Sequence, residues 1–77
     1  MTLVGTRTAN MNPNFEIIEQ EGDYILSIID RGCNNYEYVT HFYNKEDGGS
    51  YYGVYSNSYE EARMNLLNRA YSQAHFN

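Results

Sequence analysis

Two histidines and one cysteine are the side chains of this sequence with the most potential for chemistry. His41 lies four residues after Glu37, so the two share one face if this stretch is a strand. A histidine–carboxylate pair can transfer protons or bind a metal ion, but either role needs a further ligand or reacting group. His75, near the end of the chain, and Cys33, beside Arg31 in a turn-like stretch, do not supply one at a matching spacing. The simpler interpretation is a satisfied or solvated histidine and a plain turn cysteine.

The stretch Glu46-Asp47-Gly48-Gly49 resembles a fragment of a calcium-binding loop. A complete EF-hand loop has an Asp-rich start and a terminal Glu at a fixed spacing, and this sequence has neither. A solvated hairpin loop explains the two glycines and the adjoining charges more simply. We therefore expect no enzyme active site, no cofactor and no metal.

Tyrosine is the most distinctive residue type, with nine copies in 77 residues and no Trp. Tyr36, Tyr38, Tyr51 and Tyr55 fall on predicted strands and would form an aromatic platform on one face of a sheet. Platforms that bind single-stranded nucleic acid also need basic residues, and the five here are scattered. The more specific hypothesis is a protein contact through these tyrosines, because Tyr combines a large apolar area with a polar tip. The simpler interpretation, which the composition favours, is that Tyr serves half-exposed strands, for which its propensity is good.

Acidic residues outnumber basic ones by ten to five, which gives a formal net charge of −5. Glu16, Glu19 and Asp23 gather on the first predicted hairpin, together with further acidic residues. A solvated surface accounts for most of them. The more specific hypothesis is an acidic patch that engages a basic groove, which would speed association by electrostatic attraction. The charge argues against direct binding to nucleic acid.

The length and composition indicate one small domain without an internal disulfide. A chain of 77 residues with one cysteine buries a modest fraction of its surface and cannot cross-link itself. A single cysteine fits a cytoplasmic location. The first 14 residues lack the apolar core of a signal peptide, and no stretch has the length of a membrane span. We expect no contact with a membrane.

Alternating and helical patterns predict an α+β fold. We expect residues 1–14 to be a flexible N-terminal tail, because apolar residues are sparse there and Asn12-Pro13-Asn14 breaks any element. Residues 15–77 would form a single β-β-β-β-α domain. Its short turns indicate a four-stranded antiparallel β-meander with one C-terminal α-helix packed on one face. The predicted strands are residues 15–20, 23–30, 35–44 and 50–56.

The helix is the best-defined element of the prediction. Ser58 and Glu61 fit a capping box at its start. Ala62, Leu66, Ala70 and Ala74 recur every four residues and predict its buried stripe, with the row Tyr59, Arg63, Leu67 and Tyr71 beside it. In the preceding strand, Gly53 indicates either a bulge or a close approach of the helix backbone.

A single helix covers only one face of such a sheet, and no other segment is expected to cover the second face. Yet both faces of the predicted strand at 23–30 are apolar. Either the sheet curls strongly around the helix, or its second face is an interface. One form of such an interface is a structural homodimer in which two sheets pack face to face.

No signature of a protein family stands in this sequence. In its size, acidity, tyrosine content and lack of catalytic groups, the chain resembles the small inhibitors that bacteriophages encode against host enzymes and defence systems, including anti-CRISPR proteins. The resemblance implies a non-enzymatic module that covers a site on a larger protein, for example one that normally binds nucleic acid. The sequence-based hypothesis is therefore a protein-binding inhibitor, with the structural homodimer as the alternative.

Overall fold

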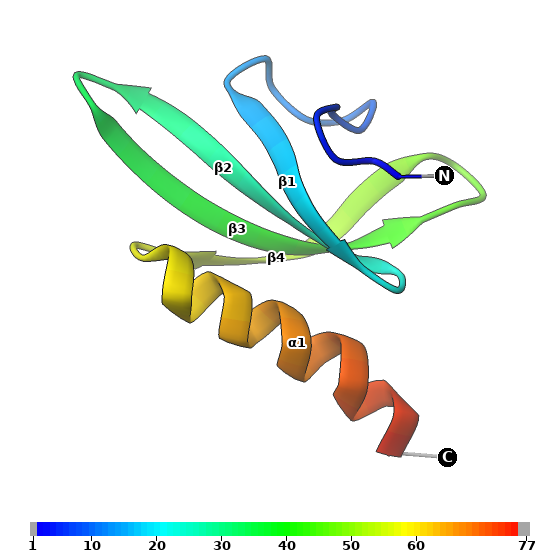
Figure 1. Cartoon of the computed structure of the whole chain (residues 1–77). Coiled ribbons are helices and arrows are strands. Elements are labelled where there is room, and N and C mark those ends of the chain that lie inside the picture. The colour runs from blue at the N-terminus through cyan, green and yellow to red at the C-terminus, as the bar shows by residue number, and fades with distance from the viewer. Residues whose placement is uncertain (1, 76–77) are drawn as a thin grey trace.

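Four antiparallel strands and one C-terminal helix make up the fold (Figure 1). The computed structural model describes residues 2–75, with side chains described up to residue 72. The elements are β1 (Phe15–Glu21), β2 (Tyr24–Gly32), β3 (Asn35–Asn44), β4 (Gly49–Ser56) and α1 (Tyr59–His75). The strands pair in the order β1-β2-β3-β4, so consecutive strands are neighbours. The predicted meander with one C-terminal helix is confirmed, and the strand bounds differ from those predicted by at most two residues.

Tight turns join the first three strands. Gly22 has a φ of 59° in the turn between β1 and β2, as predicted for a glycine there. The turn between β2 and β3 has positive φ at both central residues, 52° at Cys33 and 61° at Asn34. Gly32 pairs with Asn35 across this turn, which gives it the two-residue form of a type I′ hairpin. These turns fix the register in which one face of the sheet meets the helix.

The helix packs on one face of the sheet through Ala62, Leu66 and Ala70 of its predicted stripe, whereas Ala74 and His75 lie outside the residues whose side chains are described. Ala62 and Leu66 are buried against Tyr24 and Leu26 of β2, and Ala70 packs at the margin of the same cluster. At the start of α1, the Ser58 hydroxyl accepts a hydrogen bond from the Glu61 N–H at 3.1 Å, which is one half of the predicted capping box. The 3.6-residue period therefore identified the buried face of α1 correctly.

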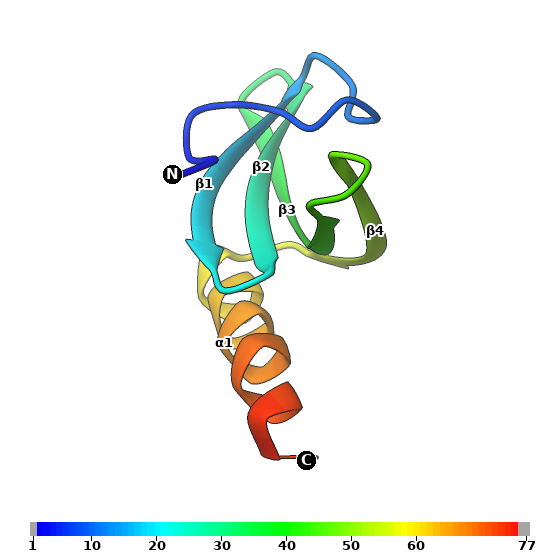
Figure 2. The same cartoon turned by 90° about the vertical axis from the view of Figure 1, so that its right-hand side faces the viewer.

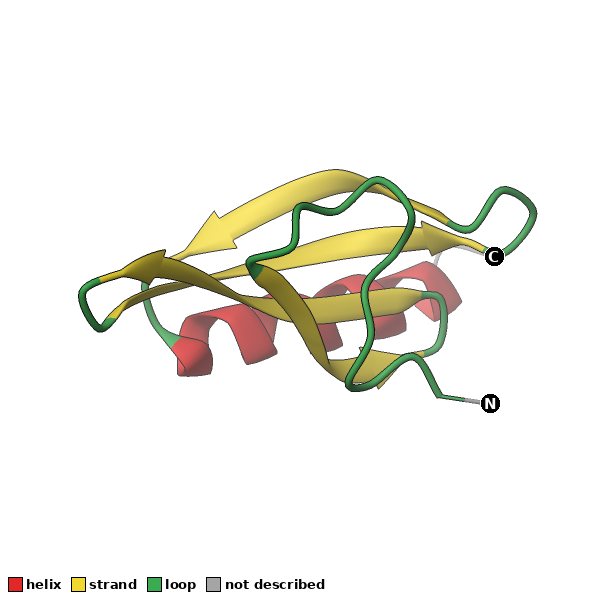
Figure 3. Cartoon of the chain, turned by 90° about the horizontal axis from the view of Figure 1, so that it is seen from above, coloured by secondary structure: helices red, strands yellow, loops and turns green. Residues whose placement is uncertain are grey.

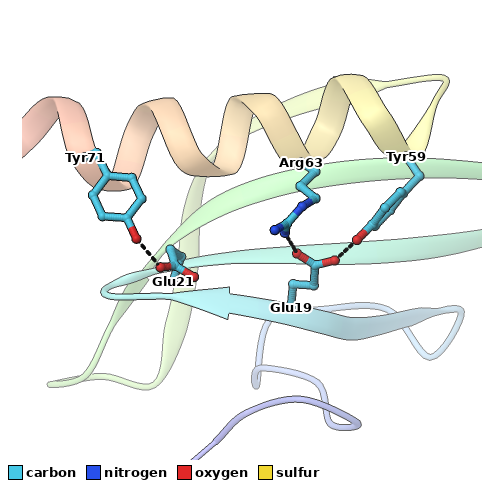
Figure 4. A network of polar contacts seen from close by, with 5 residues as sticks. All are labelled: Glu19, Glu21, Tyr59, Arg63 and Tyr71. Atoms are coloured by element: carbon cyan, nitrogen blue, oxygen red, sulfur yellow. Dashed lines mark hydrogen bonds and ion pairs between the residues drawn. The ribbon is translucent and has the colours of Figure 1, made fainter.

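A row of polar contacts ties the flank of α1 to β1 (Figure 4). The Glu19 carboxylate accepts hydrogen bonds from the Arg63 guanidinium at 2.7 Å and from the Tyr59 hydroxyl. Two residues along β1, the Glu21 carboxylate accepts from the Tyr71 hydroxyl at 2.6 Å. This hydrogen bond, and then the charge of Glu21, raises the pKa of Tyr71. The contacts fix the rotation of the helix over the sheet.

The N-terminal segment covers part of the second face of the sheet, contrary to the expectation that no segment covers it. Phe15, Ile29 and Val39 form a buried cluster on this face, and Met11 packs against it. The segment passes over the sheet on the side opposite α1 (Figure 2), and it crosses the strands when the sheet is seen from above (Figure 3). Sequence reasoning missed this cover because apolar residues are sparse in this stretch and follow no strand or helix period.

Backbone and amide groups fasten the N-terminal segment at both edges of the sheet. At β1, the Gly5 N–H donates to the Ile17 carbonyl at 2.7 Å, and the Ile17 N–H donates to the Thr6 carbonyl at 2.9 Å. At β4, the Asn10 amide accepts from the Ser50 N–H at 3.0 Å and donates to the Ser50 carbonyl at 2.8 Å. Residues 2–14 thus bridge the two edge strands, although the sequence predicts a flexible tail there.

No helix within residues 2–75 combines the length and the apolar character needed to cross a bilayer.

Candidate protein-binding surface

The four tyrosines singled out from the sequence do not share one surface. On β3, Tyr38 is partly buried in the cluster beneath α1, where its ring packs edge-on against Tyr59 with centroids 6.0 Å apart. Tyr36, two residues earlier, is 49% exposed. Tyr55 pairs with Val39 and so belongs to the face opposite the helix. The platform expected from alternation alone is therefore not formed.

Tyr51 and Tyr55 instead belong to an exposed group on β4. We call Tyr51, Tyr52, Val54 and Tyr55 the β4 edge surface. Their exposed fractions are 40%, 78%, 43% and 52%, respectively, although all four are large apolar or aromatic side chains. Sequence reasoning missed Tyr52 and Val54. The available signal was an unbroken run of uncharged residues in the last strand of a meander, which must be an edge strand.

The two edges of the sheet are protected differently. The β1 edge is paired with residues 5 and 6 and flanked by charged residues. Strand β4 contains no charged residue and no proline, which are the usual protections of an edge. Within residues 2–75, no backbone hydrogen bond from outside the sheet reaches β4 beyond Ser50, where Asn10 is bound. The outer edge of β4 is therefore open over its tyrosine-bearing part.

A β-bulge in the middle of β4 sets the direction of these side chains. Two residues, Tyr52 and Gly53, oppose the single residue His41 of β3, because the register shifts between Thr40 and Phe42. Tyr52 has a φ of 60°, which is uncommon for a bulky residue and turns its side chain outward. The bulge predicted at Gly53 is confirmed, but the neighbour that approaches this glycine is a β3 side chain. A Cβ at Gly53 would lie 3.0 Å from the His41 Nε2 atom.

His41 is buried beneath this bulge. Its side chain is 9% exposed, and its Nδ1 atom is buried without a hydrogen-bond partner. The expectation of a satisfied or solvated histidine is therefore wrong for Nδ1. Burial, and then the charge of Arg69, lowers the pKa of His41 and favours the neutral ring. Glu37, the carboxylate considered as its partner, instead binds Arg31 at 2.9 Å.

The structure separates the acidic residues predicted to form one patch. Glu19 is engaged between β1 and α1, as described above. Glu16 is exposed near the start of β1, and Asp23 is exposed in the turn at its other end, 3.6 Å from the Lys45 ammonium. Glu16 and Tyr36 both line an open groove of about 700 Å³, together with Arg7 and polar residues of the N-terminal segment.

Further acidic residues flank both ends of β4. Glu46 and Asp47 are exposed in the loop before it, and Glu60 and Glu61 are exposed in the first turn of α1 after it. Asp47 accepts hydrogen bonds from the Tyr51 hydroxyl at 2.6 Å and from the Gly49 N–H at 2.8 Å. These bonds lower the pKa of Asp47, with the Tyr51 bond contributing most. An uncharged aromatic strand thus lies between two acidic ends.

Among the described residues, no three His, Cys, Asp or Glu side chains are grouped as a metal site would require. The arrangement on β4 is suited to contact with another macromolecule, through exposed rings and unpaired backbone groups. Comparison with protein-family models, with curated proteins and with solved structures found no match to this chain.

Proposed function

We propose that this chain is a non-enzymatic protein-binding module that contacts its partner through the β4 edge surface. The observation that carries the proposal is the open edge of β4, which is rich in exposed tyrosine and has no charged residue of its own. An unprotected edge of this kind invites pairing with another chain. Tyrosine is also enriched in protein interfaces, because it buries a large area while its hydroxyl remains satisfied.

The charges of the molecule favour a protein over a nucleic acid as the partner. The net charge is −5, and Arg31 and Arg63 form ion pairs with Glu37 and Glu19. Arg69 donates to the Thr40 carbonyl and hydroxyl. These engaged cations leave little basic surface to neutralise phosphates, which supply most of the affinity in nucleic-acid binding.

The finer proposal is that the module inhibits a larger protein by covering a basic site on it. The acidic residues at both ends of β4 supply the complementary charge, and a small domain placed over a groove excludes other ligands from it. This is the mode of action implied by the resemblance to small phage inhibitors of enzymes and defence systems. It supposes a partner that itself binds nucleic acid or another anionic ligand.

The structural homodimer is the weaker alternative. A face-to-face dimer of sheets requires an open second face, and the segment that contains Met11 lies over part of that face. Such a dimer would first have to displace this segment. Light scattering over a concentration series measures the mass directly, and a monomer at high concentration would exclude the dimer.

The proposed surface is tested by capture of partners from cell extract with matched baits. In the test bait, Tyr52→Asn keeps a residue that tolerates positive φ, and Tyr55→Thr keeps a good strand former. The control bait carries Tyr36→Thr and Met64→Ser, which remove exposed apolar groups away from β4. We expect a protein held by the wild type and the control to be lost from the test bait. Equal capture by all three would refute the assignment of the surface.

The hypothesis of an acidic contact on the first hairpin has its own variant. Reversal of Glu16 and Asp23 to Lys changes the exposed charges there and leaves the Glu19 contact to α1 intact. If this surface binds the partner, capture will weaken and lose its dependence on salt. Unchanged capture with an unchanged salt dependence would restrict the contact to other surfaces.

A further inference from the structure

The Asn10 side chain already binds the outer edge of β4, and this contact shows in which direction the backbone groups of that edge point. The Asn10 side-chain amide binds both the N–H and the carbonyl of Ser50, as a neighbouring strand would. The backbone groups of Ser50 therefore point away from β3. In an antiparallel pair such outward positions alternate, and the extra residue of the bulge shifts the alternation by one. Tyr55, opposite Val39, is accordingly the next regular outward position.

We propose, on the basis of the protein-binding role above, that β4 receives an extended segment of the partner as a fifth strand, and that this segment carries Lys or Arg at both ends. Pairing of strands at a sheet edge derives affinity from backbone hydrogen bonds and specificity from alternate side chains. The centre of the segment would be uncharged, since it lies along Tyr52, Val54 and Tyr55. Residues 51–56, the part of β4 beyond the Asn10 contact at Ser50, span about 20 Å, which sets the length of the segment.

The charges at the ends of β4 identify this occupant and disfavour a second copy of the chain. An antiparallel copy would bring its own Glu46 and Asp47 opposite Glu60 and Glu61. Like charges opposed in this way repel one another, at both ends of the pair. A segment with basic ends meets the same four carboxylates with attraction. The uncharged middle of β4 then contributes apolar contact without discriminating by charge.

Titration of the full-length, isotope-labelled protein with synthetic peptides tests the proposal by NMR. The first probe is a capped peptide with a Val-Thr repeat at its centre and a pair of lysines at each end. The second replaces the lysines by glutamates, and the third carries N-methyl groups on alternate backbone nitrogens. We expect the first probe to shift the amide resonances of β4. Its affinity should exceed that of the second by at least about tenfold and should fall with added salt. The third should not bind.

Two pairs of variants locate the interaction. Tyr55→Pro removes an outward N–H and Tyr55→Val retains it, while both remove the ring, so only the first should abolish binding. Glu46→Lys with Glu60→Lys should remove the preference for lysine ends, whereas Glu16→Lys with Asp23→Lys, which changes the net charge equally, should not. If Tyr55→Pro fails to fold, the N-methylated peptide still decides whether backbone hydrogen bonds carry the binding.

Several results would overturn the inference. These are an absence of shifts in β4 at millimolar lysine-ended peptide, equal binding of the N-methylated peptide, and shifts in β4 that depend on protein concentration without peptide. The last would identify a second copy as the occupant. Any of these peptide results would refute strand addition. If the test bait with altered Tyr52 and Tyr55 nevertheless loses the partner that the wild type captures, the proposed protein-binding role still stands. If capture is also unchanged, both fail.

Discussion

Replacement of Asn10 by Ala tests whether the N-terminal segment is part of the folded domain. The Asn10 side-chain oxygen, Oδ1, accepts hydrogen bonds from the Ser50 N–H, the Ser50 hydroxyl and the Thr8 hydroxyl, at 3.0, 3.0 and 2.8 Å. Its amide nitrogen donates to the Ser50 carbonyl at 2.8 Å. The partners Thr8 and Ser50 are both 6% exposed, so water does not readily replace the lost contacts.

The expected loss of stability follows from the hydrogen bonds of Asn10 that no other group can replace. The Thr8 and Ser50 hydroxyls remain 3.0 Å apart and keep each other as partners in the variant. The two bonds to the Ser50 backbone are lost outright, at about 1 kcal/mol each with a larger penalty if the groups stay dry. We therefore expect Asn10→Ala to lower the free energy of unfolding by about 2 kcal/mol. That is a large share of the stability of so small a domain.

The assay is urea unfolding followed by circular dichroism, with amide hydrogen exchange at Ser50 as a local readout. Asn12→Ala is the matched control, because it removes an exposed amide from the same segment and should change stability by less than about 0.5 kcal/mol. A loss below about 0.5 kcal/mol for Asn10→Ala, with unchanged exchange at Ser50, would refute the reasoning. It would favour the flexible tail that the sequence predicts.

Three further perturbations probe the core, the buried histidine and a turn. Leu66→Ala should lower the unfolding free energy by about 2–5 kcal/mol in urea, and a loss below about 1 kcal/mol would mean that α1 does not pack as described. Burial and Arg69 lower the pKa of His41, so the unfolded state takes up its proton first as the pH falls. Stability should therefore be complete above about pH 6.5 and decline as the pH falls below it toward the folded pKa, and His41→Gln should flatten this slope. The double variant Cys33→Asn, Asn34→Gly suits the positive φ values of that turn, so its midpoint in urea should rise with a gain of roughly 1 kcal/mol. An unchanged or lower midpoint would contradict the turn geometry.

The sequence determined the elements and most of their packing, because those depend on local patterns. Short turns between alternating strands predict a meander, since neighbouring strands joined by two residues can only pair antiparallel. The four-residue spacing of Ala62, Leu66 and Ala70 identified the buried face of α1, because that spacing places them on one stripe of a helix.

Tertiary structure decided which residues are left free for contact. Glu19 was expected to face a partner, but it binds Arg63, which lies 44 residues away in the sequence. No local pattern reports a pairing at that distance. Strict alternation of side chains assigned the tyrosines of β4 to one face together with those of β3. The bulge at Tyr52 shifts that alternation by one residue, so the assignment fails.

The cover of the second face is the clearest case of what the sequence alone left undetermined. Residues 2–14 are mostly polar and lack a strand or helix period, and such a composition is typical of a mobile end. They are fastened by backbone groups at Ile17 and by one amide at Asn10, and these groups depend on position in space rather than on hydrophobicity. The same contacts occupy the β1 edge and leave most of β4 open. Periodicity in the chain thus determined the sheet and the helix, and the path of the N-terminal segment determined which edge of the sheet is free to bind.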